Sequence, residues 1–301
     1  MNARLNFAVF LVAINLLSAG EFVVATYNLE NFVGPNSQNR PIKPAAAKAK
    51  IVESILAVRP DVLAVQEIGK PARVKELQAM LKDKGLDLPN AEFAEGPDPV
   101  INLAVLSRFP LRGTAQNNVQ FLLGRRRLLV SRGFVEVQVH VAPEYSFTLI
   151  NAHLKSKRSI SYADEATLRL AEAKALRKIV EQRLAASPNL NLIVVGDLND
   201  APDTRPVKTV IGRGKRKLVD LRPFERNGDK ASSTNRYLPR RVTWTAYYGQ
   251  EDSFSRFDYL LASPGMDREL VRGGTYVLAI PDWGVGSDHR PVVATFTDRD
   301  K

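Results

Sequence analysis

The stretch that decides the fold covers residues 191–200 and reads NLIVVGDLND. Its first half is apolar and β-branched, so residues 191–195 are predicted to form a short buried strand. Asp197, Asn199 and Asp200 follow where the apolar run stops. The strand ends of an α/β protein are where a site is usually found, because the core fixes the backbone there and the loops leave room.

Polar side chains also stand at the ends of five other predicted strands. A solvated strand end is the ordinary explanation for any one of them, but six together indicate a shared site. The polar residues at these five ends are Asn28 and Glu30 after the strand 22–27, Glu67 at the end of 61–67, Asn151 and His153 in 146–153, Asp258 in 257–261, and Asp288 and His289 before 291–296.

Helices and strands mix along the whole chain. Apolar residues at helical spacing predict helices over 45–58, 72–84 and 163–184. Additional strands are predicted over 101–106, 133–141 and 275–278. There is no internal repeat, and no Gly/Ser or Pro linker divides the chain after its first 20 residues.

Composition favours a soluble globular protein with anionic partners. The 301 residues contain 43 Lys and Arg against 32 Asp and Glu, which gives a net charge of +11. Such a surplus favours nucleic acid or an anionic membrane surface as a partner. With no cysteine, the chain cannot form disulfides, thiolate zinc sites or a cysteine nucleophile.

The first 20 residues have the layout of a secretory signal peptide. Arg4 precedes an apolar run from Phe7 to Leu17, and the small residues Ser18 and Gly20 follow. The run is shorter than the ~20 residues that a membrane-spanning helix needs. We therefore predict a signal peptide over residues 1–20, a secreted or periplasmic protein and no stable membrane anchor; a buried first strand or helix is the alternative.

The strand-end residues offer a consistent chemistry. Carboxylate and amide oxygens, as in Asn28, Glu67 and Asp288, suit Mg²⁺, with Mn²⁺ or Ca²⁺ as alternatives, and do not suit zinc. His289 beside a carboxylate can be held in one tautomer, and His153 supplies a second imidazole. A divalent metal with two imidazoles can promote the attack of water on a phosphoester.

Seven segments together resemble the endonuclease/exonuclease/phosphatase superfamily, which has the deoxyribonuclease-I-like fold. They occur in the family's order and extend over residues 22–297. The segments are YNLEN (27–31), VQE (65–67), NLAVLSRFPL (102–111), INAHLKSK (150–157), VVGDLNDAP (194–202), RFDYLL (256–261) and GSDHRPVVATF (286–296). The resemblance implies an α/β four-layer sandwich, with two packed mixed sheets flanked by helices, as one domain over residues 21–301. Within the superfamily, the chain is most similar to secreted bacterial nucleases and phosphodiesterases.

The resemblance also implies which residues hold a metal. Glu67 would be the principal ligand, and Asn28 would help to hold the same ion. Asp288 would be a further ligand or would orient its neighbour.

A second group would carry proton transfer and phosphate binding. Asp197 would orient or deprotonate the attacking water, and Asn199 would bind the scissile phosphate. Asp258 would pair with His289, which would contact the phosphate or act as acid or base. His153 would stabilise the transition state or assist the leaving group.

Cations follow His153 directly. Lys155, Lys157 and Arg158 are expected at the mouth of the site, where they would contact phosphates without sequence specificity, and Asn151 completes the predicted substrate-binding set. Other basic runs, at 125–127, 213–217 and 240–241, can equally be solvated surface.

These features predict a secreted, monomeric, metal-dependent phosphodiesterase that hydrolyses nucleic acid with low sequence specificity. A sphingomyelinase-like phospholipase or a phosphomonoesterase of the same superfamily is the first alternative. A lipid enzyme should show an exposed apolar hairpin, for which residues 119–123 are a candidate. A basic binding protein without catalytic activity is the second alternative.

Overall fold

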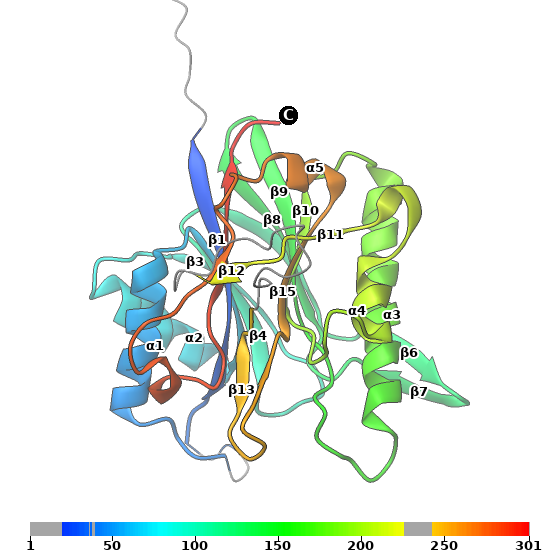
Figure 1. Ribbon diagram of the computed structural model, residues 1–301, viewed down its shortest axis with the longest axis horizontal. Helices are drawn as coiled ribbons and strands as arrows, with labels where there is room; N and C mark the ends of the chain where they lie inside the picture. Colours follow the sequence, from blue (N-terminus) through cyan, green and yellow to red (C-terminus); the bar gives the residue numbers. More distant parts are fainter. Residues whose placement is uncertain (1–19, 36, 38–39, 226–242, 301) are drawn as a thin grey trace, which may run out of the picture.

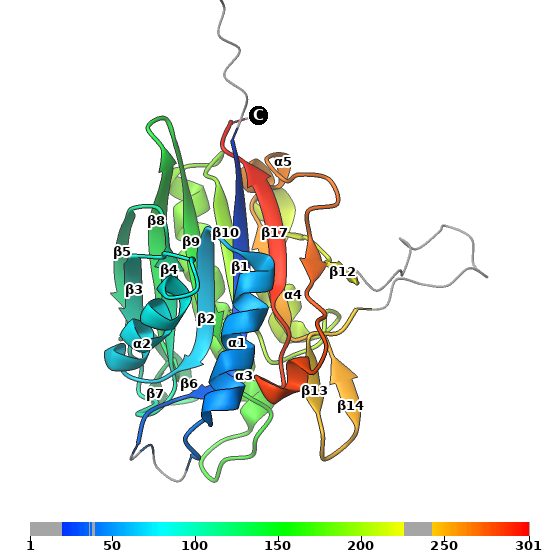
Figure 2. The ribbon, with the colours of Figure 1, turned by 90° about the vertical axis from the view of Figure 1, so that its left-hand side faces the viewer.

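The computed structural model describes residues 20–35, 37, 40–225 and 243–300. Two large β-sheets pack face to face, and helices cover their outer faces (Figure 1). The view turned by 90° shows α1 and α2 over one sheet, with α3 behind the other (Figure 2). This arrangement confirms the predicted α/β sandwich of two mixed sheets flanked by helices.

The first sheet has seven strands in the order β12-β16-β17-β1-β2-β4-β3. Its centre joins the two ends of the described chain, because β1 pairs antiparallel with β17 and parallel with β2. The strands are β1 (Glu21–Phe32), β2 (Val62–Ile68), β3 (Asn90–Ala94), β4 (Asn102–Ser107), β12 (Phe224–Glu225), β16 (Tyr276–Val277) and β17 (Val292–Thr297).

The second sheet has six strands in the order β11-β15-β10-β9-β8-β5. At its centre, β10 lies parallel to β9 and antiparallel to β15. The strands are β5 (Leu111–Gln116), β8 (Phe134–Ala142), β9 (Tyr145–His153), β10 (Leu192–Asp197), β11 (Val219–Asp220) and β15 (Asp258–Ala262).

Three apolar layers hold the four structural layers together. The middle layer lies between the sheets and contains Phe22, Phe147 and Val195, all at most 1% exposed. A second layer joins the first sheet to α1 (Ala45–Val58) and α2 (Pro71–Lys82). The third joins the second sheet to α3 (Glu165–Ala186) and α4 (Arg205–Ile211).

Smaller elements decorate this sandwich. Two separate hairpins are formed by β6 (Gln120–Leu123) with β7 (Arg126–Leu129), and by β13 (Ala246–Tyr248) with β14 (Ser253–Ser255). The remaining elements are the short helix α5 (Pro264–Arg268) and the 3₁₀ turns η1 (Gly214–Arg216) and η2 (Trp283–Val285).

The predicted signal peptide lies almost wholly outside the described residues, so it stays a prediction; β1 begins at Glu21, directly after it. Within the described chain, no helix is long and apolar enough to cross a membrane. The basic pair Arg240 and Arg241 also lies outside the described residues.

Candidate active site

Three neighbouring strands of the second sheet bring predicted site residues into one row. Asp197 at the end of β10 is in register with His153 on β9 and with Asp258 on β15. Side chains alternate between the two faces of a strand, so Asp197 shares the face of Ile193 and Val195, which belong to the middle apolar layer. The row of His153, Asp197 and Asp258 therefore lies at one end of the sandwich, next to the apolar layer between the sheets.

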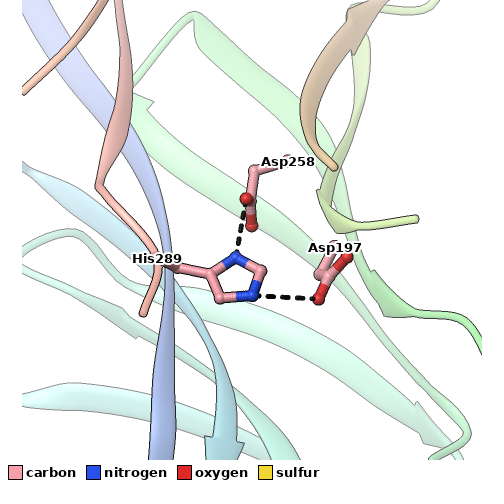
Figure 3. A group of neighbouring side chains, drawn as sticks. All are labelled: Asp197, Asp258 and His289. Atoms are coloured by element: carbon pink, nitrogen blue, oxygen red, sulfur yellow. Dashed lines mark hydrogen bonds and ion pairs between the residues drawn. The ribbon is translucent and has the colours of Figure 1, made fainter. Parts of the chain in front are cut away.

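Asp258 and His289 form a buried pair (Figure 3). The Nδ1 atom of His289 lies 2.8 Å from Asp258 Oδ2. Burial alone would lower the pKa of His289, but Asp258 and the carboxylates of Asp197 and Asp288 raise it well above its usual value. Asp258 is thus placed to fix the tautomer of His289, with Nδ1–H donating to the carboxylate.

Asp197 lies between the two imidazoles. Its Oδ2 atom is 3.7 Å from His289 Nε2 and 3.5 Å from His153 Nε2, and it accepts a hydrogen bond of 3.1 Å from the amide of Asn28. The backbone N–H of Asn199 donates to its other oxygen at 2.8 Å. Burial raises the pKa of Asp197 to about 7, so this carboxylate can gain or lose a proton near neutral pH.

His153 is held in its neutral form. The imidazole is 1% exposed, and burial, followed by the charge of Arg132, lowers its pKa well below the usual value. Its Nδ1 atom is buried without a hydrogen-bond partner among the described residues. A neutral imidazole can donate one N–H to an incoming oxygen without carrying a charge into the buried site.

The first sheet contributes carboxylates from the opposite side. Glu67 interrupts the pairing of β2 with β4 and has a left-handed backbone, with φ of 58°. Such a bulge redirects a side chain, and here Glu67 lines the cleft together with Glu30 and Asp288. Burial, with repulsion from Glu67 and Asp258, raises the pKa of Asp288.

This carboxylate group fits a hard divalent cation. Glu67 and Asp288 offer oxygen ligands only, and a cation would relieve the repulsion that raises the pKa of Asp288. Asp197, Asp258 and His289 also bring one ligand atom each within 4.8 Å of one another. We assign that second trio to proton handling, because the Asp258–His289 bond orients the imidazole with its Nε2 atom towards Asp197.

Most of the predicted residues line a single cleft of about 790 Å³. These are Glu67, His153, Lys155, Lys157, Arg158, Asp197, Asn199, Asp288 and His289. Asp258 is fully buried behind His289, and Asn28 is buried behind Asp197, where its amide oxygen accepts from the backbone of Glu30 at 3.0 Å. The side chains therefore converge as the sequence predicted, although their roles stay predictions.

One residue of the predicted substrate-binding set does not line the cleft. Asn151 is fully buried and lies between the two sheets. Its amide donates to the carbonyl oxygens of Val65 at 3.0 Å and Ala104 at 2.9 Å, and its oxygen accepts from Gln66 at 2.7 Å. Asn151 ties the sheets together beneath the site, because the same strand face that leads to His153 points into the sandwich.

Two charged residues that support the site were not predicted. Glu172 of α3 is 1% exposed and accepts hydrogen bonds from the backbone N–H groups of Ser131 and Lys155 at 2.8 and 2.6 Å. Arg169, one turn earlier, donates to the carbonyl of Lys155 at 3.1 Å and to Asp200 at 2.9 Å. Glu172 could have been identified from the sequence, because it lies four residues from both Leu168 and Leu176. It is therefore a carboxylate inside the apolar stripe of the helix.

A family comparison agrees with this geometry. The model of the endonuclease/exonuclease/phosphatase family matches residues 25–289. The chain belongs to this family. Its members are hydrolytic phosphoesterases, and the match extends from β1 to His289, so it includes every residue of the proposed site. No curated protein matches the sequence.

Solved structures share the deoxyribonuclease-I-like fold at low identity. The human nocturnin catalytic domain with a bound sulfate anion is 16% identical, with a TM-score of 0.61, and the match covers 92% of this chain and 94% of that one. Truncated Caenorhabditis elegans TDP2 is 17% identical, with a TM-score of 0.57 and coverages of 92% and 98%. Staphylococcus aureus beta toxin is 14% identical, with a TM-score of 0.61 and coverages of 91% and 99%.

Proposed function

We propose that this protein is a metal-dependent phosphodiesterase that hydrolyses nucleic acid with low sequence specificity, and that it acts after secretion. One observation carries the chemistry: the Asp258–His289 pair, Asp197 and the carboxylate of Glu67 meet at one cleft between the sheets. Family membership supports phosphoester hydrolysis. The layout of residues 1–20 supports secretion.

The proposed mechanism divides the work among the buried groups. Asp197, with a pKa of about 7, accepts a proton from the attacking water. His289, oriented by Asp258, presents its Nε2 side to the scissile phosphate as an acid or a charged donor. Neutral His153 donates an N–H to a phosphoryl oxygen, and Asn199 contributes a further polar contact at the same rim.

A divalent cation would be held by Glu67 and Asp288, with Asn28 supporting the site from behind. When bound, it would neutralise charge on the phosphoryl oxygens, as Mg²⁺ does in other phosphoester hydrolases. The oxygen-only donor set favours Mg²⁺, with Mn²⁺ or Ca²⁺ as alternatives.

Nucleic acid is favoured as substrate by the charge of one cleft wall. Lys155, Lys157 and Arg158 line it, and Arg40 and Arg132 are further cations of the same cleft. The amine of Lys155 is engaged by its own loop, since it donates to the carbonyl of Arg158 at 2.8 Å. Lys157 and Arg158 are therefore the cations proposed to contact flanking phosphates.

The test is hydrolysis of plasmid DNA, RNA and bis(p-nitrophenyl) phosphate by the mature chain, with and without EDTA. We expect hydrolysis of nucleic acid that EDTA abolishes and Mg²⁺ restores. Activity that survives EDTA would refute the metal-dependent mechanism. The absence of any phosphodiester hydrolysis would refute the proposal and favour a binding protein.

A lipid substrate is a second candidate, supported by a hairpin that the sequence did not reveal. The β13–β14 hairpin borders the cleft and leaves Tyr248 48% exposed and Phe254 55% exposed. Exposed aromatic side chains on a basic protein are suited to a membrane interface. Release of phosphocholine from sphingomyelin, without hydrolysis of nucleic acid, would favour this candidate over the nuclease.

A further inference from the structure

The β6–β7 hairpin stands apart from both large sheets. It projects from the body of the molecule beside α3 (Figure 1). Phe121 anchors it, since this side chain packs against the apolar layer under α3. The outer part is exposed: Leu122 is 68% exposed, and Gly124 and the three arginines Arg125, Arg126 and Arg127 are exposed as well.

The arginines of this hairpin have no acidic partners. No described carboxylate lies within ion-pair distance of Arg125, Arg126 or Arg127, whereas most other arginines near the site are paired, such as Arg169 with Asp200. Arg126 instead donates to the carbonyl of Tyr162 at 3.3 Å, and its guanidinium lies 5.9 Å from the centre of that ring. Three adjacent unpaired cations repel one another, so an anionic partner would bind there favourably.

The hairpin is continuous with the catalytic cleft. Leu129 at its base and Tyr162 both line the cleft, close to Lys157 and Arg158. Side chains alternate along a strand, so Arg127 lies on the same face of β7 as Leu129. The basic wall of the cleft thus extends outward onto the hairpin.

We infer that the β6–β7 hairpin binds the backbone phosphates of a nucleic-acid chain whose scissile phosphate lies in the cleft. This inference rests on the proposed function and specifies its substrate as a polymer. Arg125 lies four positions before Leu129 in the chain, which at the rise of a β-strand is about 13 Å. Phosphates of one strand of a duplex advance by about 3.4 Å per step, so the tip lies about four steps beyond the cleft.

The test compares substrates of increasing length in two double variants. Arg125→Ala/Arg127→Ala removes the hairpin cations, and Arg213→Ala/Lys215→Ala removes two exposed cations that do not line the cleft. The measured quantity is kcat/KM for oligonucleotides of 2 to 16 nucleotides, relative to kcat/KM for bis(p-nitrophenyl) phosphate, which has one phosphate.

For the wild type and the control variant, we expect this ratio to rise with length beyond about four nucleotides. In the hairpin variant, the ratio for the 16-mer should fall about 10-fold or more, and the slope of log(kcat/KM) against log[salt] should become shallower by about 1.4 to 1.8, the effect of two lost phosphate contacts.

The outcomes separate the hairpin from the catalytic proposal. If the wild type cleaves oligonucleotides and the hairpin variant behaves like the control variant, the hairpin contact is refuted and the nuclease stands. If the wild type cleaves no oligonucleotide, the nuclease function and the hairpin contact are both refuted. If the hairpin variant loses binding to phosphatidylserine vesicles but cleaves the 16-mer normally, the hairpin binds membranes instead, and the inference is overturned.

Discussion

Several residues around the cleft have backbone conformations that their side chains disfavour. Glu67, Glu30, Asn31 and Asn199 all have positive φ values, between 44° and 62°. A glycine would adopt this conformation at lower cost, but it would bring no oxygen ligand or amide to the cleft. Strain of this kind is maintained where the surrounding structure enforces it, and two of these four residues, Glu67 and Asn199, are proposed to hold the metal and the phosphate.

Glu67→Gly should separate ligand loss from backbone effects. Glycine relieves the left-handed strain and increases the entropy of the unfolded chain by a similar amount, but it also removes the hydrogen bond that Glu67 accepts from the Asn31 N–H at 3.0 Å, so the free energy of unfolding should fall by about 1 kcal/mol. The Mg²⁺ concentration for half-maximal activity should rise at least about 10-fold, with partial rescue at high Mg²⁺. Titration of activity with Mg²⁺ measures the metal requirement, and urea unfolding in EDTA measures the change in stability. An unchanged Mg²⁺ requirement would contradict the ligand role of Glu67.

The Asp258–His289 pair should be essential for turnover. His289→Ala removes the proposed proton donor and should lower kcat by about 10²–10⁴-fold. Asp258→Asn keeps the shape of the side chain but can donate to Nδ1, which favours the wrong tautomer, so a similar loss is expected. His140→Ala is the matched control, because His140 lies on β8 and does not line the cleft. Near wild-type kcat in either site variant would show that the pair has no role in catalysis.

His153 should make the fold less stable in acid. Its pKa is lowered by burial and by Arg132, so the folded chain binds fewer protons at this position than the unfolded chain does. Stability from this group is therefore present above about pH 6.5 and is lost as the pH falls below that value, by up to about 1.4 kcal/mol per pH unit. In urea unfolding between pH 7 and 5, in EDTA, His153→Gln should show a shallower decline than the wild type; parallel declines would contradict a neutral buried His153.

At the scale of elements, the long helix α3 positions one wall of the cleft. Its buried Glu172 and Arg169 hold the loops that carry Ser131, Lys155 and Asp200. Helix propensity does not explain why the charged side chains of Glu172 and Arg169 are buried on the inward face of α3. They are buried there because they form hydrogen bonds with backbone groups that would otherwise be unpaired. The loops that contact substrate are therefore fixed from behind by a rigid element.

Glu172→Gln should weaken this support. Glutamine has one acceptor oxygen in place of two, and its amide would face the N–H of Lys155 or Ser131 as a second donor. We expect a loss of about 2–4 kcal/mol in the free energy of unfolding. Glu181→Gln, on the same helix, removes a half-exposed partner of Arg177 and should cost less than about 1 kcal/mol. Equal losses in urea unfolding of the two variants would contradict the positioning role.

The sequence predicted the longer elements that the apolar layers define, and it missed some of the short ones. The helices at 45–58 and 163–184 and the central strands were predicted within a few residues, because buried side chains impose a clear period. The β13–β14 hairpin and α4 were missed because they are short and partly exposed. For Asn151, the sequence shows a polar strand end but not which face of the strand points between the sheets.

At the scale of the whole molecule, one cleft combines carboxylates with a group of cations. Glu67 of the first sheet and Asp197 of the second line it together with the cations that follow β9. The net charge of +11 draws a polyanion towards the molecule, and the carboxylate side can bind it productively only with a cation present. Substrate capture and metal dependence are in this way two consequences of the same division of the cleft lining into cations and carboxylates.

This division predicts a steep dependence on salt that is specific to polymeric substrates. If Lys157, Arg158, Arg125 and Arg127 each neutralise one phosphate of a duplex, log(kcat/KM) should fall with log[salt] at a slope near −3.6, or about 10²-fold between 50 and 200 mM. Hydrolysis of bis(p-nitrophenyl) phosphate should change far less, because it has one phosphate and no condensed counterions to release. Measuring both substrates at fixed Mg²⁺ separates binding of the polymer from binding of the metal. Equal salt slopes for the two would mean that the surplus positive charge does not act on the substrate, and the basic wall and the hairpin would then need another partner.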